Sequence, residues 1–141
     1  SGSERILLVD DEPQIVDMEK QILERLGYRV TALSSSLEAL NTFARQPDQF
    51  DLVITDMTMP QLAGDRLARR LWDIRPDLPV ILCTGYNEMI SEDKATAMGI
   101  RKFLLKPVDK DELAVAIRSA LNSTPPLYLV PRKRPAALAA S

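Results

Sequence analysis

The chain has 141 residues, of which 45% are hydrophobic and 27% charged, and its formal net charge is -2. This length suits one domain with its own core. No apolar run approaches the roughly 18 residues that cross a bilayer, so we expect no membrane insertion and a cytoplasmic location. The chain contains no His, which excludes a phosphohistidine of its own, a His-ligated metal and a Ser-His nucleophile.

Both ends of the chain are expected to lie outside the folded domain. Residues 1–3, Ser-Gly-Ser, are typical of a cloning scar, and residues 123–141 are interpreted as a Pro-rich tail or linker. This tail holds three basic residues and no acid, so the 18 basic residues less these three leave 15 against 20 acidic ones, a net charge of -5. An acidic domain over residues 4–122 disfavours nucleic-acid binding.

Apolar runs and helical periodicities alternate along the expected domain. Strands are expected at residues 5–9, 28–33, 52–56, 79–83 and 101–105. Helices are expected at residues 13–26, from 35 past 44, and at 65–74, 87–98 and 109–122. Helix-start and helix-stop signals are Pro13, Gly27, the pair Ser35 and Glu38, and the pair Asp109 and Glu112. Strands that alternate with helices predict a parallel sheet with helices on both faces, a three-layer α/β fold.

The helices are expected to bury apolar stripes. These stripes are Ile15, Val16, Met18, Ile22, Leu23 and Leu26 in the first helix, Leu37, Leu40 and Ala44 in the second, Leu67, Ala68, Leu71 and Ile74 in the third, and Leu113, Ile117, Ala120 and Leu121 in the last. The helix expected at 87–98 has only a ragged apolar face. The single cysteine, Cys83, lies in an apolar run and is interpreted as a buried thiol.

Polar residues follow four of the predicted strands. They are Asp10 and Asp11, Asp56, Thr84, and Lys106. Because the carboxyl ends of parallel strands meet at one edge of a sheet, these residues are expected to converge there, where α/β proteins bind ligands. Each has a structural explanation when taken alone: Asp11 as a helix cap, Thr84 as part of a turn, and Lys106 as the start of a loop. Their conjunction favours a functional site.

Acidic residues gathered at one edge need a compensating charge. Two carboxylates about 5 Å apart repel by roughly 3 kcal/mol at an effective dielectric constant near 20, and Mg²⁺ suits a site of one or two carboxylates, a carbonyl and water. A carboxylate beside Mg²⁺ suggests phosphoryl chemistry, with an Asp as nucleophile and an ammonium and a hydroxyl sharing the charge of the transferring oxygens. Lys106 and Thr84 fit these last two roles.

The residues that carry this chemistry resemble the receiver domain of two-component response regulators. The resemblance spans about residues 4–122 and rests on Leu8-Val9-Asp10-Asp11-Glu12-Pro13, Asp56-Met57, Met59-Pro60, Gly64, Thr84-Gly85 and Lys106-Pro107. It implies a flavodoxin-like (βα)5 fold with strand order 2-1-3-4-5 and a cis peptide bond before Pro107.

The resemblance also implies a function. A histidine kinase or a histidine phosphotransfer protein would give its phosphoryl group to Asp56, the phosphorylation site. Asp10, Asp11, Asp56 and the Thr58 carbonyl would hold Mg²⁺, and Lys106 would pair with the phosphoryl oxygens. Thr84 and Phe103 would form a conformational switch, although Phe103 lacks the hydroxyl of the Tyr that the family often has there. A domain of this kind catalyses its own phosphotransfer and dephosphorylation, and a weak homodimer is compatible with it.

Two other functions compete with the phosphoacceptor. The first is a receiver fold that serves as a protein-interaction module without phosphorylation, which the complete Asp, Thr and Lys set disfavours. The second is a small phosphatase with an aspartyl-phosphate intermediate, which needs a general acid two residues after the nucleophile, where Thr58 stands. The basic run Arg132-Lys133-Arg134 is interpreted as a solvated end rather than a nucleic-acid contact.

The parent protein is expected to be a hybrid sensor kinase or phosphorelay protein rather than a DNA-binding regulator. The run Ile81–Tyr86 is similar to the fourth-strand ending of receivers fused to kinases, whereas many DNA-binding regulators have Thr-Ala there. The Ser-Gly-Ser start suggests an excised domain, and no helix-turn-helix pattern follows Asn122. In this interpretation Tyr86 overhangs the phosphoryl group and, with Thr58, slows its hydrolysis.

Overall fold

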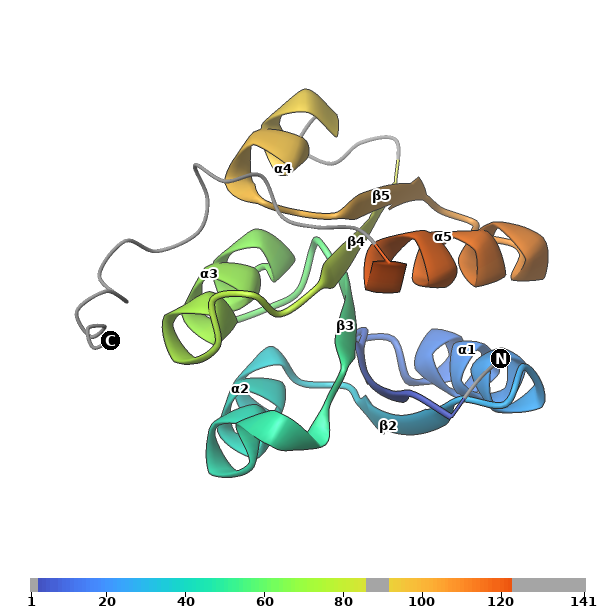
Figure 1. The fold of residues 1–141 in the computed structure, drawn as a ribbon, viewed down its shortest axis with the longest axis horizontal. Helices are drawn as coiled ribbons and strands as arrows, with labels where there is room; N and C mark the ends of the chain where they lie inside the picture. Colours follow the sequence, from blue (N-terminus) through green and yellow to red (C-terminus); the bar gives the residue numbers. More distant parts are fainter. Residues whose placement is uncertain (1–2, 86–91, 123–141) are drawn as a thin grey trace.

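The computed structural model describes residues 3–85 and 92–122, which form a sheet flanked by helices (Figure 1). All strand pairs in the sheet are parallel, and the strand order is β2-β1-β3-β4-β5. The strands are β1 Arg5–Val9, β2 Arg29–Leu33, β3 Leu52–Asp56, β4 Val80–Thr84 and β5 Lys102–Leu105. The flavodoxin-like α/β fold and the strand order expected from the sequence are therefore confirmed.

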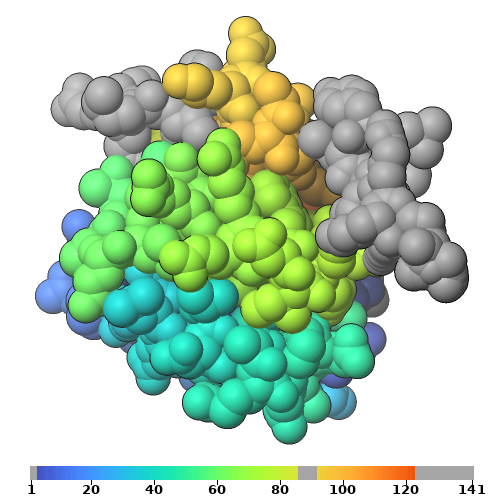
Figure 2. All heavy atoms as spheres, turned by 90° about the vertical axis from the view of Figure 1, so that its left-hand side faces the viewer, coloured from blue at the N-terminus to red at the C-terminus, as the bar shows by residue number. Residues whose placement is uncertain are grey.

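Helices cover both faces of the sheet, so the molecule has three layers (Figure 1). The helices are α1 Pro13–Arg25, α2 Ser36–Arg45, α3 Gly64–Ile74, α4 Glu92–Met98 and α5 Lys110–Asn122, with a short 3-10 helix, η1, at Pro47–Gln49. Helices α1 and α5 lie on one face and α2, α3 and α4 on the other. Figure 2 shows α2 in cyan and α3 in green side by side on one flank.

Each face of the sheet contributes to its own hydrophobic cluster, because successive strand residues point to opposite faces. Leu7, Val53 and Leu82 pack under α2, α3 and α4, whereas Leu8 and Ile54 pack under α1 and α5. The central strands β1, β3 and β4 are apolar on both faces, as expected for parallel strands covered on both sides. Rigid packing of this kind fixes the positions at which the strands end.

The predicted helix-start and helix-stop residues lie where the helices begin and end. Pro13 is the first residue of α1, and Gly27 follows its end with a positive φ of 99°. The Ser35 side chain accepts a hydrogen bond of 3.2 Å from the Glu38 backbone N–H at the start of α2. At the start of α5 a reciprocal capping box forms: Asp109 and Glu112 each accept a hydrogen bond from the other's backbone N–H.

The expected inward face of α2 was displaced by about one residue, although Leu40 is half-buried and packs against the cluster as predicted. Leu37 is 42% exposed and Ala44 is exposed, and the buried residues are Ser36, Ala39 and Phe43. Each residue turns the helix by about 100°, so three scattered apolar residues leave the direction of the face ambiguous. Small residues at positions 36 and 39 let the helix approach the sheet, and Phe43 then fills the space below them.

Helices α1 and α3 also depart from their predicted stripes. In α1, Met18 is 50% exposed while Glu19 is 8% exposed and lies on the buried face with Val16 and Leu23. In α3, Ile74 at the last position is 39% exposed. The stripe predicted for α1 was too wide. Apolar residues lie on both sides of the helix face that packs on the sheet, so the predicted stripe also included a flank that faces solvent.

Some expectations fall on residues outside the described part of the chain. Residues 87–91 of the helix expected at 87–98 are among them, and α4 is described from Glu92 to Met98. Residues 1–2, Tyr86 and the tail 123–141 also lie outside it. Among the helices that the structure describes, none combines the length and the apolar character needed to cross a membrane.

Candidate functional site

The strand ends bring the predicted polar residues to one edge of the sheet. Strands β1 and β3 are neighbours, with Val9 opposite Thr55, so Asp10 and Asp56 follow side by side. Thr84 is the last residue of β4, and Lys106 follows β5. The parallel register thus gathers residues that are as much as 96 positions apart in the chain.

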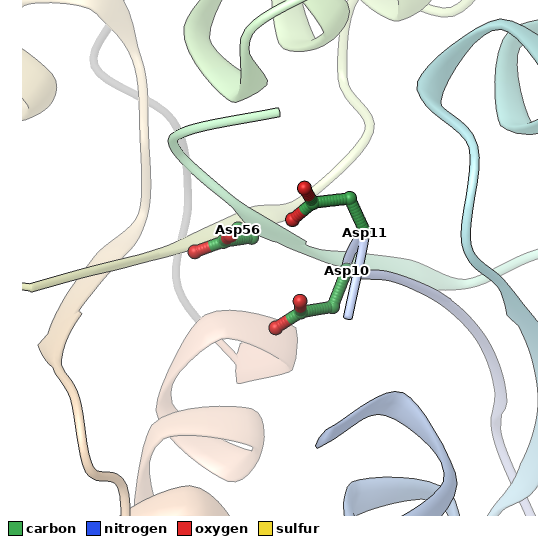
Figure 3. Close-up of side chains that lie close together, drawn as sticks. All are labelled: Asp10, Asp11 and Asp56. Atoms are coloured by element: carbon green, nitrogen blue, oxygen red, sulfur yellow. The ribbon is translucent and has the colours of Figure 1, made fainter. Parts of the chain in front are cut away.

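Three carboxylate groups, those of Asp10, Asp11 and Asp56, meet at this edge of the sheet, which we call the acidic edge. Asp10, Asp11 and Asp56 each offer one oxygen atom, and these atoms all lie within 4.8 Å of one another. Figure 3 shows the three side chains pointing to the same side, two from the segment after β1 and one from the end of β3. Asp10 is 2% and Asp56 4% exposed, so their mutual repulsion is weakly screened by water.

Lys106 provides a positive charge within this group. Its ammonium nitrogen lies 2.9 Å from Oδ1 of Asp56 and 3.5 Å from Oδ2 of Asp10. Burial alone would lower the pKa of Lys106, but the hydrogen bond to Asp56 and the charges of both carboxylates outweigh burial and raise that pKa. The Lys106–Pro107 peptide bond is cis, as expected, and the Lys106 backbone N–H donates a 2.7 Å hydrogen bond to the Thr84 carbonyl.

The beginning of α1 shows that Asp11 is not a helix cap. The cap residue is Glu12, whose side chain makes no capping hydrogen bond, and its backbone N–H donates to Oδ1 of Asp10 at 3.0 Å. Within residues 3–85 and 92–122, the Asp11 side chain has no hydrogen bond or ion pair. The structural explanation of Asp11 as a cap is therefore wrong, and its carboxylate is available to a ligand at the acidic edge.

The loop after β3 is held close to Asp56. The Gly64 N–H donates a 2.7 Å hydrogen bond to the Met57 carbonyl, and a Cβ atom on Gly64 would overlap the backbone carbonyl of Asp56. Only glycine permits this approach. The loop exposes Thr58, and no described backbone N–H donates to the Thr58 carbonyl oxygen outside the helices and strands.

The two residues predicted to form a switch lie on neighbouring strands at the β4–β5 side of the site. Thr84 is 1% exposed, and its hydroxyl donates a 3.3 Å hydrogen bond to the Gly85 carbonyl. Phe103 is half-buried in β5, opposite Leu82, and packs against the cluster under α3 and α4. The structure therefore places Thr84 at the acidic edge. Phe103 lies farther from this edge, two residues before Leu105, which is the register partner of Thr84.

Glu19 is a titratable residue of this region that the sequence analysis missed. Its side chain is buried between α1 and the sheet, and burial, then the negative charge of Asp10, raises its pKa from 4.5 to about 7, with Lys106 acting in the opposite direction. Among the described residues it has no hydrogen-bond or ion-pair partner. Its spacing from Val16 and Leu23, three and four residues away, was the available signal, because these positions share a helix face.

The fold and the site define a flavodoxin-like α/β protein with an acidic, lysine-containing site at the carboxyl edge of its sheet. A model of the response regulator receiver domain matches residues 6–118. The chain belongs to the response regulator receiver domain family, whose members act in two-component signal transduction.

Individual relatives agree with this assignment. The transcriptional regulatory protein GlrR of Escherichia coli K12 is 36% identical over 121 residues, which cover 86% of this chain and 27% of GlrR. The chain thus spans about a quarter of the length of this curated relative. A receiver domain protein from Clostridium thermocellum superposes with a TM-score of 0.81 at 38% identity, covering 85% of this chain and 95% of that one.

A third similar structure contains a metal ion. The receiver domain of the sensor histidine kinase PA1611 from Pseudomonas aeruginosa PAO1 superposes with a TM-score of 0.75 at 26% identity, covering 87% of this chain and all of that one. In that protein a magnesium ion is coordinated in the active-site cleft.

Proposed function

We propose that the domain accepts a phosphoryl group on Asp56. The observation that carries this proposal is the environment of the Asp56 carboxylate: it is buried at the end of the central strand, hydrogen-bonded to Lys106, and within 4.8 Å of oxygen atoms of Asp10 and Asp11. A packed strand end holds a nucleophile in a fixed position, which lowers the entropic part of the barrier to transfer. The donor is a phosphohistidine of a histidine kinase or of a histidine phosphotransfer protein.

The acidic edge fits a divalent cation. Asp10, Asp11 and Asp56 would hold Mg²⁺ through carboxylate oxygens, with the Thr58 carbonyl as a further ligand. Hard oxygen ligands of this number suit Mg²⁺, which keeps several waters. Bound there, Mg²⁺ would neutralise charge on the phosphoryl oxygens. The magnesium ion in the PA1611 receiver supports this assignment by similarity.

In the proposed transfer, an oxygen of Asp56 attacks phosphorus while the phosphorus–nitrogen bond of the donor breaks and the imidazole leaves with the electron pair. Lys106 moves with its hydrogen bonds from the carboxylates to a phosphoryl oxygen, where its charge compensates the new negative charge. The hydroxyl of Thr84 turns from the Gly85 carbonyl toward another phosphoryl oxygen, and Phe103 moves into the space beside it. The same residues support hydrolysis of the acyl phosphate by water.

An intact-mass measurement tests the proposal. Treated with acetyl phosphate and Mg²⁺, the protein should gain the mass of one phosphoryl group, whereas Asp56→Asn should gain none. Asp73→Asn is the matched control, because Asp73 is an exposed residue of α3, and it should be labelled like the unchanged protein. No gain by the unchanged protein would favour the interaction-module function, and full labelling of Asp56→Asn would refute the site.

The parent protein remains the second part of the proposal. We infer a hybrid sensor kinase from the Ile81–Gly85 run that ends β4, and the similarity to the receiver of one sensor histidine kinase, PA1611, supports this origin. The alternative is that the domain comes from a transcriptional regulator, as GlrR is. The full-length gene should encode a histidine-kinase core, and the phosphorylated domain should pass its label to a histidine phosphotransfer protein. A DNA-binding domain in the same gene would contradict this origin.

A further inference from the structure

A hollow of about 350 Å³ lies at the opposite end of the sheet from the acidic edge. It is bounded by the first residues of β1 and β2 and by the last turn of α2 with η1. Helix α2 ends at Arg45 and η1 follows at Pro47–Gln49, so the end of α2 and η1 form one border of the hollow. The strand residues that line the hollow are Arg5, Arg29, Val30 and Thr31, of which only Val30 is apolar.

Two arginine residues face the hollow from adjacent strands. Arg5 in β1 and Arg29 in β2 are register partners. Leu7 and Leu33, each an even number of residues away, pack against the cluster under α2, so both arginine side chains leave the sheet on that same face. Like charges opposite one another on neighbouring strands are destabilising, and this pair needs a compensating negative charge.

Only one of the two arginine side chains is compensated by the described residues. Arg5 donates to both carboxylate oxygens of Asp51, at 3.3 and 3.2 Å, and to the Asp48 carbonyl at 3.0 Å. The hydrogen bonding of the Asp51 carboxylate with the Arg5 side chain lowers the pKa of Asp51. Arg29 is exposed, and within residues 3–85 and 92–122 its guanidinium makes no hydrogen bond or ion pair. The described part of the chain thus offers the Arg29 charge no partner.

The other side chains of the hollow can complete an anion site. Thr31, Thr42 and Gln46 add a hydroxyl, a second hydroxyl and an amide, all hydrogen-bond donors, and Phe50 adds an apolar surface. None of the described residues that line the hollow is acidic. A volume of 350 Å³ lies at the small end of the range of about 300 to 1,000 Å³ in which proteins bind small molecules.

We propose that this hollow binds a small organic anion whose carboxylate or phosphate group is held by Arg29, with Thr31, Thr42 and Gln46 as further hydrogen-bond donors and Phe50 contacting the apolar part. A guanidinium presents parallel N–H groups that match two oxygens of either anion. The site is independent of Asp56, because the two lie at opposite ends of the strands. Its ligand would therefore bind the unphosphorylated and the phosphorylated domain.

Titrations followed by amide NMR test the proposal without Mg²⁺ and at constant ionic strength. Succinate represents a carboxylate ligand, inorganic phosphate a phosphate ligand, and succinamide is the neutral control. At least one anion should shift amide signals of residues 29–31 and 42–50, and succinamide should not. Binding of succinate alone would assign a carboxylate ligand, and binding of phosphate alone a phosphate ester. The same shifts should appear in Asp56→Asn, which separates this site from the proposed phosphorylation.

Two variants that each lose one positive charge distinguish a specific anion site from general electrostatic attraction of the anion to the protein. Arg29→Gln should weaken binding about ten-fold or more, since a hydrogen bond to a charged group is lost. Arg70→Gln removes the same charge from an exposed position of α3 and should leave binding unchanged. Equal weakening by both variants, or no shift with either anion, would overturn the proposal.

Discussion

Lys106 donates a 2.9 Å hydrogen bond to the Asp56 carboxylate across a sequence separation of 50 residues. The same ammonium group reaches Asp10 at 3.5 Å, so one lysine holds together two buried acids of the acidic edge. Removal of this charge affects the whole group of carboxylates, and the sensitivity of the fold to it should depend on whether another cation is present.

Lys106→Met should lower the free energy of unfolding in EDTA by about 2 kcal/mol, because two buried carboxylates lose their cation and the lysine is only partly exposed. Added Mg²⁺ should recover part of this loss. Urea denaturation with EDTA or Mg²⁺ measures both effects. Lys20→Met is the control, because Lys20 forms an exposed pair with Glu24 at 4.0 Å and should change little. Equal losses in both variants, or no recovery with Mg²⁺, would contradict this.

Asp11→Asn should have opposite effects on stability and on metal binding. Without Mg²⁺ it removes repulsion between neighbouring carboxylates and should raise the free energy of unfolding by about 1 kcal/mol. It should also weaken Mg²⁺ by about an order of magnitude, since a charged ligand is lost. Calorimetric titration and urea denaturation measure these changes. Glu12→Gln, at the exposed next residue, should have smaller effects on both, and an equal effect would show that only the overall charge matters.

Glu19→Gln should change the pH dependence of stability. The raised pKa of Glu19, about 7 against an ordinary 4.5, means that the folded state binds this proton more tightly than the unfolded state. The stability contributed by the protonated form is therefore lost as pH rises from 4.5 to about 7, by at most about 3 kcal/mol.

The Gln side chain cannot ionise, so the variant should gain stability relative to the unchanged protein as the pH rises from about 5 to about 8. Urea denaturation at several pH values measures this difference. The control is Glu24→Gln, at a side chain that is 49% exposed, and it should show no such trend. A difference that stays constant with pH would show that Glu19 is ionised throughout.

Gly64→Ala should destabilise the fold and displace Asp56. The added Cβ would overlap the Asp56 carbonyl oxygen and lie 3.0 Å from Cδ1 of Leu82, which forces the loop away at a cost of about 1–3 kcal/mol. Labelling by acetyl phosphate should slow in parallel. Gly85→Ala is a suitable control for stability, because nothing lies within 4 Å of its added Cβ. If the two variants are equally stable, the close approach at Gly64 is unimportant.

Phosphorylation should alter amide exchange mainly in residues 84–105, the part of the chain that contains Thr84 and Phe103 and partly lies outside the described residues. Helix α4 has one buried side chain, Ala95, and weak packing is where a two-state element is found. Hydrogen exchange with and without acetyl phosphate measures the change, and Asp56→Asn should show none. Changes confined to the loop after Asp56 would indicate that no switch exists.

The alternating strands and helices and the acidic edge could be predicted because each rests on local signals, whereas the strand order came from the resemblance to receiver domains. Apolar runs ended by Asp, Thr or Lys gave the strand ends, and the parallel arrangement that alternating helices imply then placed those ends together. The predicted helix-start residues were confirmed for the same reason, since a cap such as Asp109 with Glu112 involves only neighbours in the chain.

Features that depend on the register between distant segments could not be predicted. Arg5 and Arg29 face one hollow only because β1 and β2 pair in one particular register. Glu19 was missed because a polar residue inside an apolar stripe is usually exposed, and its burial depends on how α1 lies on the sheet. The face of α2 was displaced because Leu37 and Ala44 have suitable spacing, yet the buried face holds Ser36 and Ala39, one position earlier in each turn, and Phe43.

The hydroxyl of Ser36, in the first turn of α2, donates a 3.2 Å hydrogen bond to the carbonyl of Pro60. The loop after Asp56 is thus held at two points: by β3, which it follows, and by this hydrogen bond at Pro60. Fixing a free backbone residue costs roughly 1–2 kcal/mol of conformational entropy. Because Thr58 lies between the two fastened points, most of its freedom is already lost in the folded chain, and ordering its carbonyl around a cation would cost little more.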